Sequence, residues 1–135
     1  MPATDGETTV TEYTIELEIF EGNGGEPQPD GASPDFAREG ICAWMHGGHG
    51  ERSLRVGDRF SYPEDIGLLC PWLLDSLTGF LRALEHGGTL PWRYRGTPYE
   101  KALDPEGVTT EFIRCPDPTA SGIVVKLTRT ALPDA

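Results

Sequence analysis

The sequence of 135 residues lacks a cluster of basic residues, a long apolar run and an even number of cysteines. No apolar stretch approaches the roughly 20 residues that span a bilayer, so we expect no membrane partner. The first residues, Met-Pro-Ala-Thr-Asp-Gly-Glu, have neither a basic nor an apolar region, so we expect no secretory signal. Three cysteines cannot all pair in disulfides, which favours reduced thiols and a cytoplasmic protein.

The net charge of −11 is distributed unevenly along the chain. Residues 1–39 contain ten acidic residues and one basic residue, whereas residues 40–135 contain twelve acidic and ten basic residues. Neither part has the clustered Lys and Arg that binding to a phosphate backbone requires, so nucleic acid is not an expected partner. We interpret the acidic segment as a solvated strand face and loop.

Short periodic segments predict the strands. Between residues 12 and 19 apolar side chains alternate with polar ones, which is typical of a half-buried strand with an acidic outer face. Residues 56–62, 108–114 and 123–128 predict three further strands, and residues 35–38 one helical turn. We expect a flexible tail at residues 1–8 and a single domain over residues 9–132, with a long Gly/Pro-rich loop at residues 22–40.

The clearest predicted element is a helix over residues 71–86. Cys70 takes the N-cap position, Pro71 takes the favoured first position, and Gly87 and Gly88 follow the end. The sequence therefore predicts an α+β fold, in which a small antiparallel sheet of about four strands is packed by one main amphipathic helix. The apolar residues expected between helix and sheet are Leu73, Leu77, Phe80, Leu81, Leu84, Ile15, Leu17, Val125 and Leu127.

Each cysteine belongs to a short motif: Gly-Ile-Cys42-Ala-Trp, Leu-Cys70-Pro-Trp and Arg-Cys115-Pro-Asp. Further motifs are Gly-Asp at residues 57–58, Gly-Gly-Thr-Leu-Pro-Trp at residues 87–92 and Val-Val-Lys-Leu at residues 124–127. In type and order these motifs resemble those of a family of small prokaryotic proteins of uncharacterised function. The resemblance covers residues 56–127. It implies a compact fold with a site near the cysteines, and no particular activity.

The cysteines predict a site for a soft metal ion. Cys42, Cys70, Cys115 and His46 would supply three sulfurs and one nitrogen, a ligand set that suits zinc, and thiolates also suit iron. The backbone donors at the start of a helix would favour a thiolate at Cys70. Since there is no Cys-x-x-Cys pair, the ligands come from separate segments. We expect them to meet because element ends gather at one rim of a helix-on-sheet fold. The alternative that a buried cysteine only packs in the hydrophobic core stays open.

Two other functions stay open. In a thiol-dependent enzyme, Cys70 would be the nucleophile, His49 its base and Asp117 the residue that orients the base. Three tryptophans could line a pocket for a small hydrophobic or planar molecule, namely Trp44, Trp72 and Trp92. In a non-catalytic binding module, an exposed edge strand could pair with a second copy to form a homo-oligomer.

Overall fold

The computed structural model describes residues 12–25, 30–32, 34–46, 54–119 and 123–132. The predicted tail at residues 1–8 lies outside the described residues, as does His49. Within the described ranges, no helix has both the length and the apolar character needed to cross a membrane.

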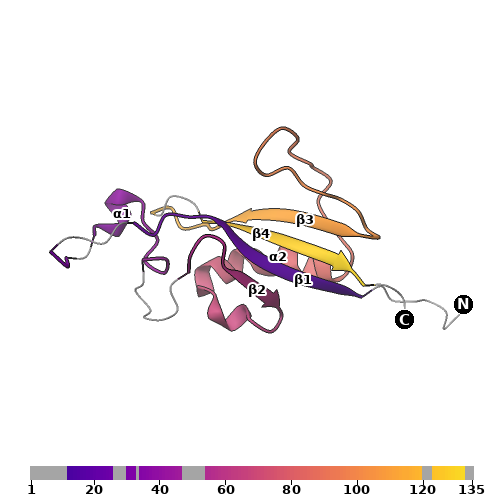
Figure 1. Ribbon diagram of the computed structural model, residues 1–135, viewed down its shortest axis with the longest axis horizontal. Coiled ribbons are helices and arrows are strands. Elements are labelled where there is room, and N and C mark those ends of the chain that lie inside the picture. Colours follow the sequence, from indigo (N-terminus) through magenta and orange to yellow (C-terminus); the bar gives the residue numbers. More distant parts are fainter. Residues whose placement is uncertain (1–11, 26–29, 33, 47–53, 120–122, 133–135) are drawn as a thin grey trace, which may run out of the picture.

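Four strands and one main helix make up the fold (Figure 1). The strands form one antiparallel sheet in the order β2-β1-β4-β3, and α2 lies along one face of it, behind the sheet in Figure 1. The predicted α+β class is confirmed. The elements are β1 (Tyr13–Glu21), α1 (Phe36–Glu39), β2 (Arg59–Tyr62), the short 3₁₀ helix η3 (Ile66–Leu68), α2 (Pro71–Glu85), β3 (Val108–Arg114) and β4 (Val124–Ala131).

The two central strands, β1 and β4, supply the inner face of the sheet. Leu17 pairs with Leu127 and Ile19 with Val125, so side chains of the same face meet across the two strands. All four are buried, whereas Glu18, between Leu17 and Ile19 on β1, is only half-buried. The alternation read from the sequence of β1 is therefore confirmed.

Four leucines fasten α2 to this inner face. Leu73, Leu77, Leu81 and Leu84 recur at helical spacing and are at most 1% exposed. Burying a leucine side chain contributes about 1.5–3 kcal/mol, so this stripe is a major source of stability. Phe80, which was expected in the same core, is only half-buried because it lies on the flank of the helix.

The C-terminal end of α2 is held by a buried arginine of β4. Arg129 is 1% exposed. Its Nη1 donates to the carbonyls of Leu84 and Gly88, both at 3.0 Å, and its Nη2 donates to Thr109 Oγ1 at 3.2 Å. The guanidinium also lies 4.4 Å from the centre of the Tyr13 ring. A cation at this end of a helix interacts favourably with the helix dipole, so Arg129 joins the helix to the sheet with no carboxylate partner among the described residues.

A long connection between α2 and β3 projects beyond the edge of β3 (Figure 1). Its return half follows that strand, because Thr110 donates its N–H to the carbonyl of Ala102 at 2.9 Å. Lys101 is 4% exposed, and its ammonium group donates to Glu111 Oε2 at 3.0 Å and to the carbonyl of Leu90 at 2.9 Å. This buried ion pair ties both ends of the connection to the sheet.

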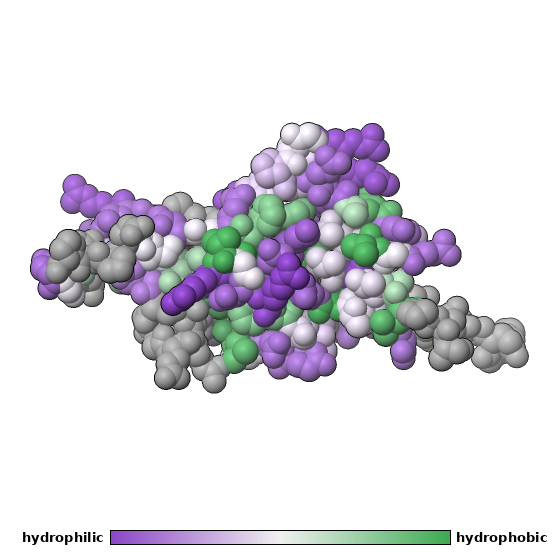
Figure 2. All heavy atoms as spheres, in the orientation of Figure 1, coloured by the Kyte–Doolittle hydropathy of each residue, from purple (hydrophilic) through white to green (hydrophobic). Residues whose placement is uncertain are grey.

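The outer face of the sheet is mostly hydrophilic, with apolar patches between the charged side chains (Figure 2). One such patch is aromatic: the Phe112 ring packs edge-on against Phe20 and Tyr99, with ring centres 5.0 and 5.7 Å apart. The hydroxyl of Tyr99 donates to Glu21 at 2.5 Å. The connection before β3 thus covers part of the face that the sequence predicted to be solvated.

Replacing Arg129 by methionine should lower the free energy of unfolding by at least about 2 kcal/mol. The Arg129→Met protein keeps the volume of the side chain, but the carbonyls of Leu84 and Gly88 lose their donor. Arg59→Met is the matched control, because Arg59 is exposed and only forms surface ion pairs with Glu16 and Glu18. Urea unfolding should show a loss below about 1 kcal/mol for the control. Equal losses would contradict the role of Arg129.

Candidate thiol site

The three cysteines lie beside the ends of three elements, α1, α2 and β3. Cys42 follows α1, and its N–H donates to the carbonyl of Asn23 beyond the end of β1 at 2.9 Å. Cys70 is the N-cap of α2. Cys115 directly follows β3, and its N–H donates to the carbonyl of Ile123 at 2.8 Å. Element ends therefore bring together residues that are far apart in the sequence.

Charge interactions show that the thiols are neighbours. Burial raises the pKa of the Cys42 thiol, and negative charge on Cys70 and Asp117 raises that pKa further. Burial likewise raises the pKa of Cys115, with further contributions from Cys70, Asp117 and Cys42. Because such interactions weaken with distance and are screened by solvent, they place the three thiols and the Asp117 carboxylate in one region.

Backbone donors point at two of the sulfurs. The N–H groups of Trp44 and Met45 donate to the sulfur of Cys42, which lowers its pKa and opposes the effect of burial. The N–H of Asp117 does the same for the sulfur of Cys115. Hydrogen bonds of this kind stabilise the thiolate form and orient the sulfur. The turns after Cys42 and Cys115 are thus shaped to support negative charge on sulfur.

Cys70 differs from the expectation drawn from its position. It is the N-cap residue, and its carbonyl accepts the N–H of Leu74 at 2.8 Å, but its side chain makes no capping hydrogen bond. The expected hydrogen bonds from the first N–H groups of the helix to its sulfur are therefore not formed. The sulfur is half-buried at the edge of the core and is not used in capping.

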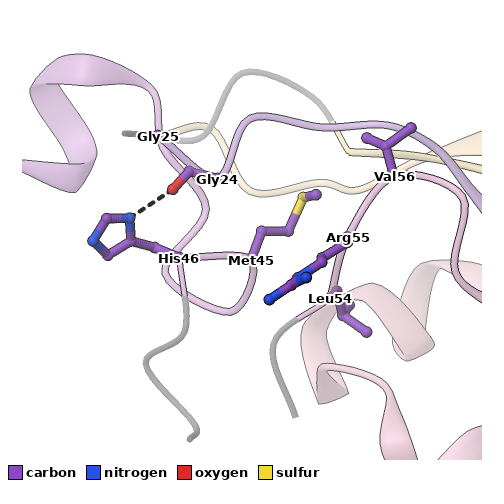
Figure 3. A pocket seen from close by; sticks show the side chains of 7 residues that line it. All are labelled: Gly24, Gly25, Met45, His46, Leu54, Arg55 and Val56. Atoms are coloured by element: carbon purple, nitrogen blue, oxygen red, sulfur yellow. Dashed lines mark hydrogen bonds between the residues drawn. The ribbon is translucent and has the colours of Figure 1, made fainter. Parts of the chain in front are cut away.

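His46 is turned towards another part of the chain. Its Nδ1 lies 2.6 Å from the carbonyl of Gly24 (Figure 3). Its ring packs edge-on against Phe36, with ring centres 5.5 Å apart. Since a carbonyl can only accept, Nδ1 carries a proton and donates it. The contacts of the imidazole thus hold the segment after α1 against the end of β1, and they are not with the thiols.

A cavity of about 490 Å³ lies beside His46. Met45, Leu54 and Arg55 line it on the side away from the imidazole (Figure 3). Gly25 forms part of its wall with a φ of 71°, and a Cβ there would lie 2.7 Å from Cδ1 of Ile41. Glycine is therefore required at this position by both its backbone conformation and its close packing.

Asp117 shapes a turn. Its Oδ1 accepts the backbone N–H of Thr119 at 2.8 Å and the hydroxyl of Thr119 at 2.7 Å. This is the local hydrogen bonding typical of an Asx turn, so the carboxylate holds the chain after Cys115 in place. The proposed role of Asp117 in orienting His49 falls on a residue outside the described part of the chain.

The tryptophans lie on different elements. Trp72 and Trp92 are 49% and 58% exposed, and Trp44 is half-buried against the core. None of the three lines the cavity beside His46, the cavity between Tyr94 and Val124, or the cavity along α2. The structure does not bring them together as the wall of one of these cavities.

No group of three or more His, Cys, Asp or Glu side chains is arranged to hold a metal ion in the described part of the chain. The absence of such a group is compatible with the charge interactions between the thiols, because charges act over longer distances than the roughly 2.3 Å of a zinc–sulfur bond. The thiols are neighbours without forming a closed coordination sphere. The predicted ligand set that includes His46 is not assembled.

Sequence reasoning missed one buried polar group of functional interest, Glu111. Its position on β3 could have been found, since it lies two residues before Ile113 and two after Thr109 and so shares the inner face with them. The sequence pattern does not predict its ion pair with Lys101, because Lys101 lies in an irregular segment without periodicity.

In comparisons with known proteins, no family model, no curated protein and no solved structure matches this chain. The resemblance to a small prokaryotic family therefore stays a prediction that rests on the cysteine, Gly-Gly and Pro-Trp motifs.

Raising the pH should destabilise the protein through its buried thiols. Burial raises the pKa of Cys42 and Cys115, so the folded protein keeps protons that the unfolded chain releases. The free energy of unfolding should be unaffected below the ordinary cysteine pKa of about 8.5 and fall as the pH rises above it. Urea unfolding at a series of alkaline pH values measures this effect.

The control is the Cys42→Ala/Cys115→Ala protein. It should start less stable but lose less free energy over the same pH range, because both titrating thiols are gone. Tyr62, whose pKa is also raised by burial, is unchanged in this variant and contributes equally to both proteins. A pH dependence identical to that of the parent protein would contradict the assignment.

Proposed function

We propose that Cys42, Cys70 and Cys115 form a thiolate site for a soft metal ion, zinc or iron, in a small cytoplasmic protein. The observation that carries the proposal is that three thiols from distant segments lie at element ends, with Cys70 close enough to contribute, after burial, to the raised pKa of both Cys42 and Cys115. Chance core cysteines have no reason to gather in this way. That all three are free also supports a reducing compartment.

The raised pKa values of Cys42 and Cys115 fit a site of this kind when no cation is bound. Burial, and to a smaller extent neighbouring negative charge, opposes the ionisation of Cys42 and Cys115, so these two thiols keep their protons. A bound divalent cation attracts the thiolates and so favours their charged form, and it displaces the thiol protons. The backbone donors at Cys42 and Cys115 already favour the charged form. The set is thus suited to exchanging protons for a metal ion.

Three sulfurs suit zinc or iron better than magnesium or calcium, which prefer oxygen ligands. Binding would draw the sulfurs to about 2.3 Å from the ion, and Cys70 has a side chain that no capping bond restrains. The fourth position would fall to the neighbouring Asp117 or to water. His46 could supply only its Nε2, because its Nδ1 donates to the carbonyl of Gly24.

A thiol-dependent enzyme is the second candidate. The observation that favours it is the half-buried Cys70 sulfur, which is not used in capping the helix. Burial that raises the pKa of Cys42 and Cys115 makes these two thiols poor nucleophiles at neutral pH, so Cys70 would have to act without them. Its reaction with an alkylating reagent separates the two candidates.

Protein purified without a metal-affinity tag should contain close to one zinc or iron per chain by elemental analysis. The Cys70→Ser/Cys115→Ser protein should contain none, because a single remaining thiolate cannot hold the ion. Affinity for added Zn²⁺ should rise with pH, since binding releases thiol protons. His86→Ala is the matched control, because His86 is an exposed metal-binding side chain beyond the end of α2.

Metal content that survives the double substitution would contradict the proposal, as would a folded parent protein that neither contains nor takes up zinc or iron. In the second case, fast alkylation of Cys70 would support the enzyme, and three unreactive thiols would support the non-catalytic module.

A further inference from the structure

A second cavity, of about 570 Å³, lies along the second half of α2. It is bounded by the flank of the helix, by the chain that follows the helix and by β3. Its lining is mostly apolar, and the residues that matter are Ser76, Gly79, Phe80, Ala83, Leu90 and Glu111. None of the three cysteines lines it, so it is separate from the thiol site.

Small residues on α2 make room for this cavity. Gly79 lies in the middle of a 15-residue helix, where glycine costs about 1 kcal/mol relative to alanine. A Cβ at Gly79 would meet no atom within 4 Å, so packing does not require glycine there. Gly79 therefore keeps space open at a cost in helix stability, while Phe80 and Leu90 supply apolar walls.

Glu111 supplies a polar group to this cavity, although the residue is only 2% exposed. Its Oε2 accepts from Lys101 at 3.0 Å, and its Oε1, for which the described residues supply no donor, keeps contact with solvent. A carboxylate can accept about four hydrogen bonds, so Oε1 is able to accept one from a molecule in the cavity. The lining thus contains an accessible acceptor that a bound molecule could use in place of water.

We propose that the cavity binds a small, mostly apolar molecule that carries a neutral hydrogen-bond donor. The N–H or O–H of the molecule donates to Oε1 of Glu111, and its apolar body lies between Phe80 and Leu90. A neutral donor fits better than a cation because Lys101 already balances the charge of Glu111. An anion is disfavoured by Glu111 and by Asp75, which also lines the cavity. The volume is in the range of about 300–1,000 Å³ that is typical of small-molecule sites.

Indole and benzothiophene test the proposal as probes on the full chain. The two molecules have nearly the same shape, but only indole has an N–H donor. In an amide NMR titration, indole should shift the signals of Gly79, Ala83 and Leu90. Benzothiophene should bind roughly tenfold more weakly or worse, because it leaves Oε1 of Glu111 without a donor.

A variant that fills the cavity provides the second test. Gly79→Leu should remain folded, since the new Cβ meets open space and leucine is the better helix former, and it should abolish indole binding. Gly67→Leu is the control, because Gly67 also has open space around it but lies in η3, away from the cavity. This control should bind indole as the parent does.

Three results would overturn the proposal. The first is the absence of localised shifts with millimolar indole. The second is equal affinity for benzothiophene, which would remove the role of Glu111. The third is indole binding that survives Gly79→Leu, which would place the site elsewhere. None of these results depends on the thiols or on a metal ion.

Discussion

The two layers of this protein depend on a buried arginine for which the described residues supply no acidic partner. Arg129 of β4 binds two carbonyls at the end of α2, and this contact and the four leucines determine how the helix crosses the sheet. A helix of 15 residues is about 22 Å long. Fixing one end of α2 therefore also determines where Cys70, at its other end, lies relative to the ends of β1 and β3.

This arrangement gives the two ends of α2 different surroundings. At its start, three cysteines gather near Asp117, and burial together with nearby negative charge raises the pKa of Cys42 and Cys115. Along its second half, an ion pair lies buried beside a cavity, and one carboxylate oxygen lacks a hydrogen-bond partner among the described residues. Both features are departures from a simple apolar core, and both lie where irregular chain meets a regular element.

The strands and α2 could be predicted because their patterns are local. The alternation at Tyr13–Glu21 and the Pro71 start of α2 need no knowledge of the rest of the chain. The burial of Arg129 and Glu111 could also have been predicted, since each lies two residues from a buried neighbour on its strand and so on the same face. The orientation of His46 was not, because it depends on the carbonyl of Gly24, which a long loop brings to it. Nor could the sequence show that the sulfur of Cys70 leaves the helix start uncapped.

The claim that three thiols share one region is tested most directly by the pKa of Cys42 and Cys115 in the parent protein and in Cys70→Ser. Serine preserves the N-cap of α2, so the fold should be retained. The ¹³Cβ shifts of the two remaining cysteines, followed through an alkaline titration, report each pKa. Removing the negative charge at position 70 should lower the pKa of both thiols. If both values stay unchanged, the thiols are not neighbours and the proposed site does not exist.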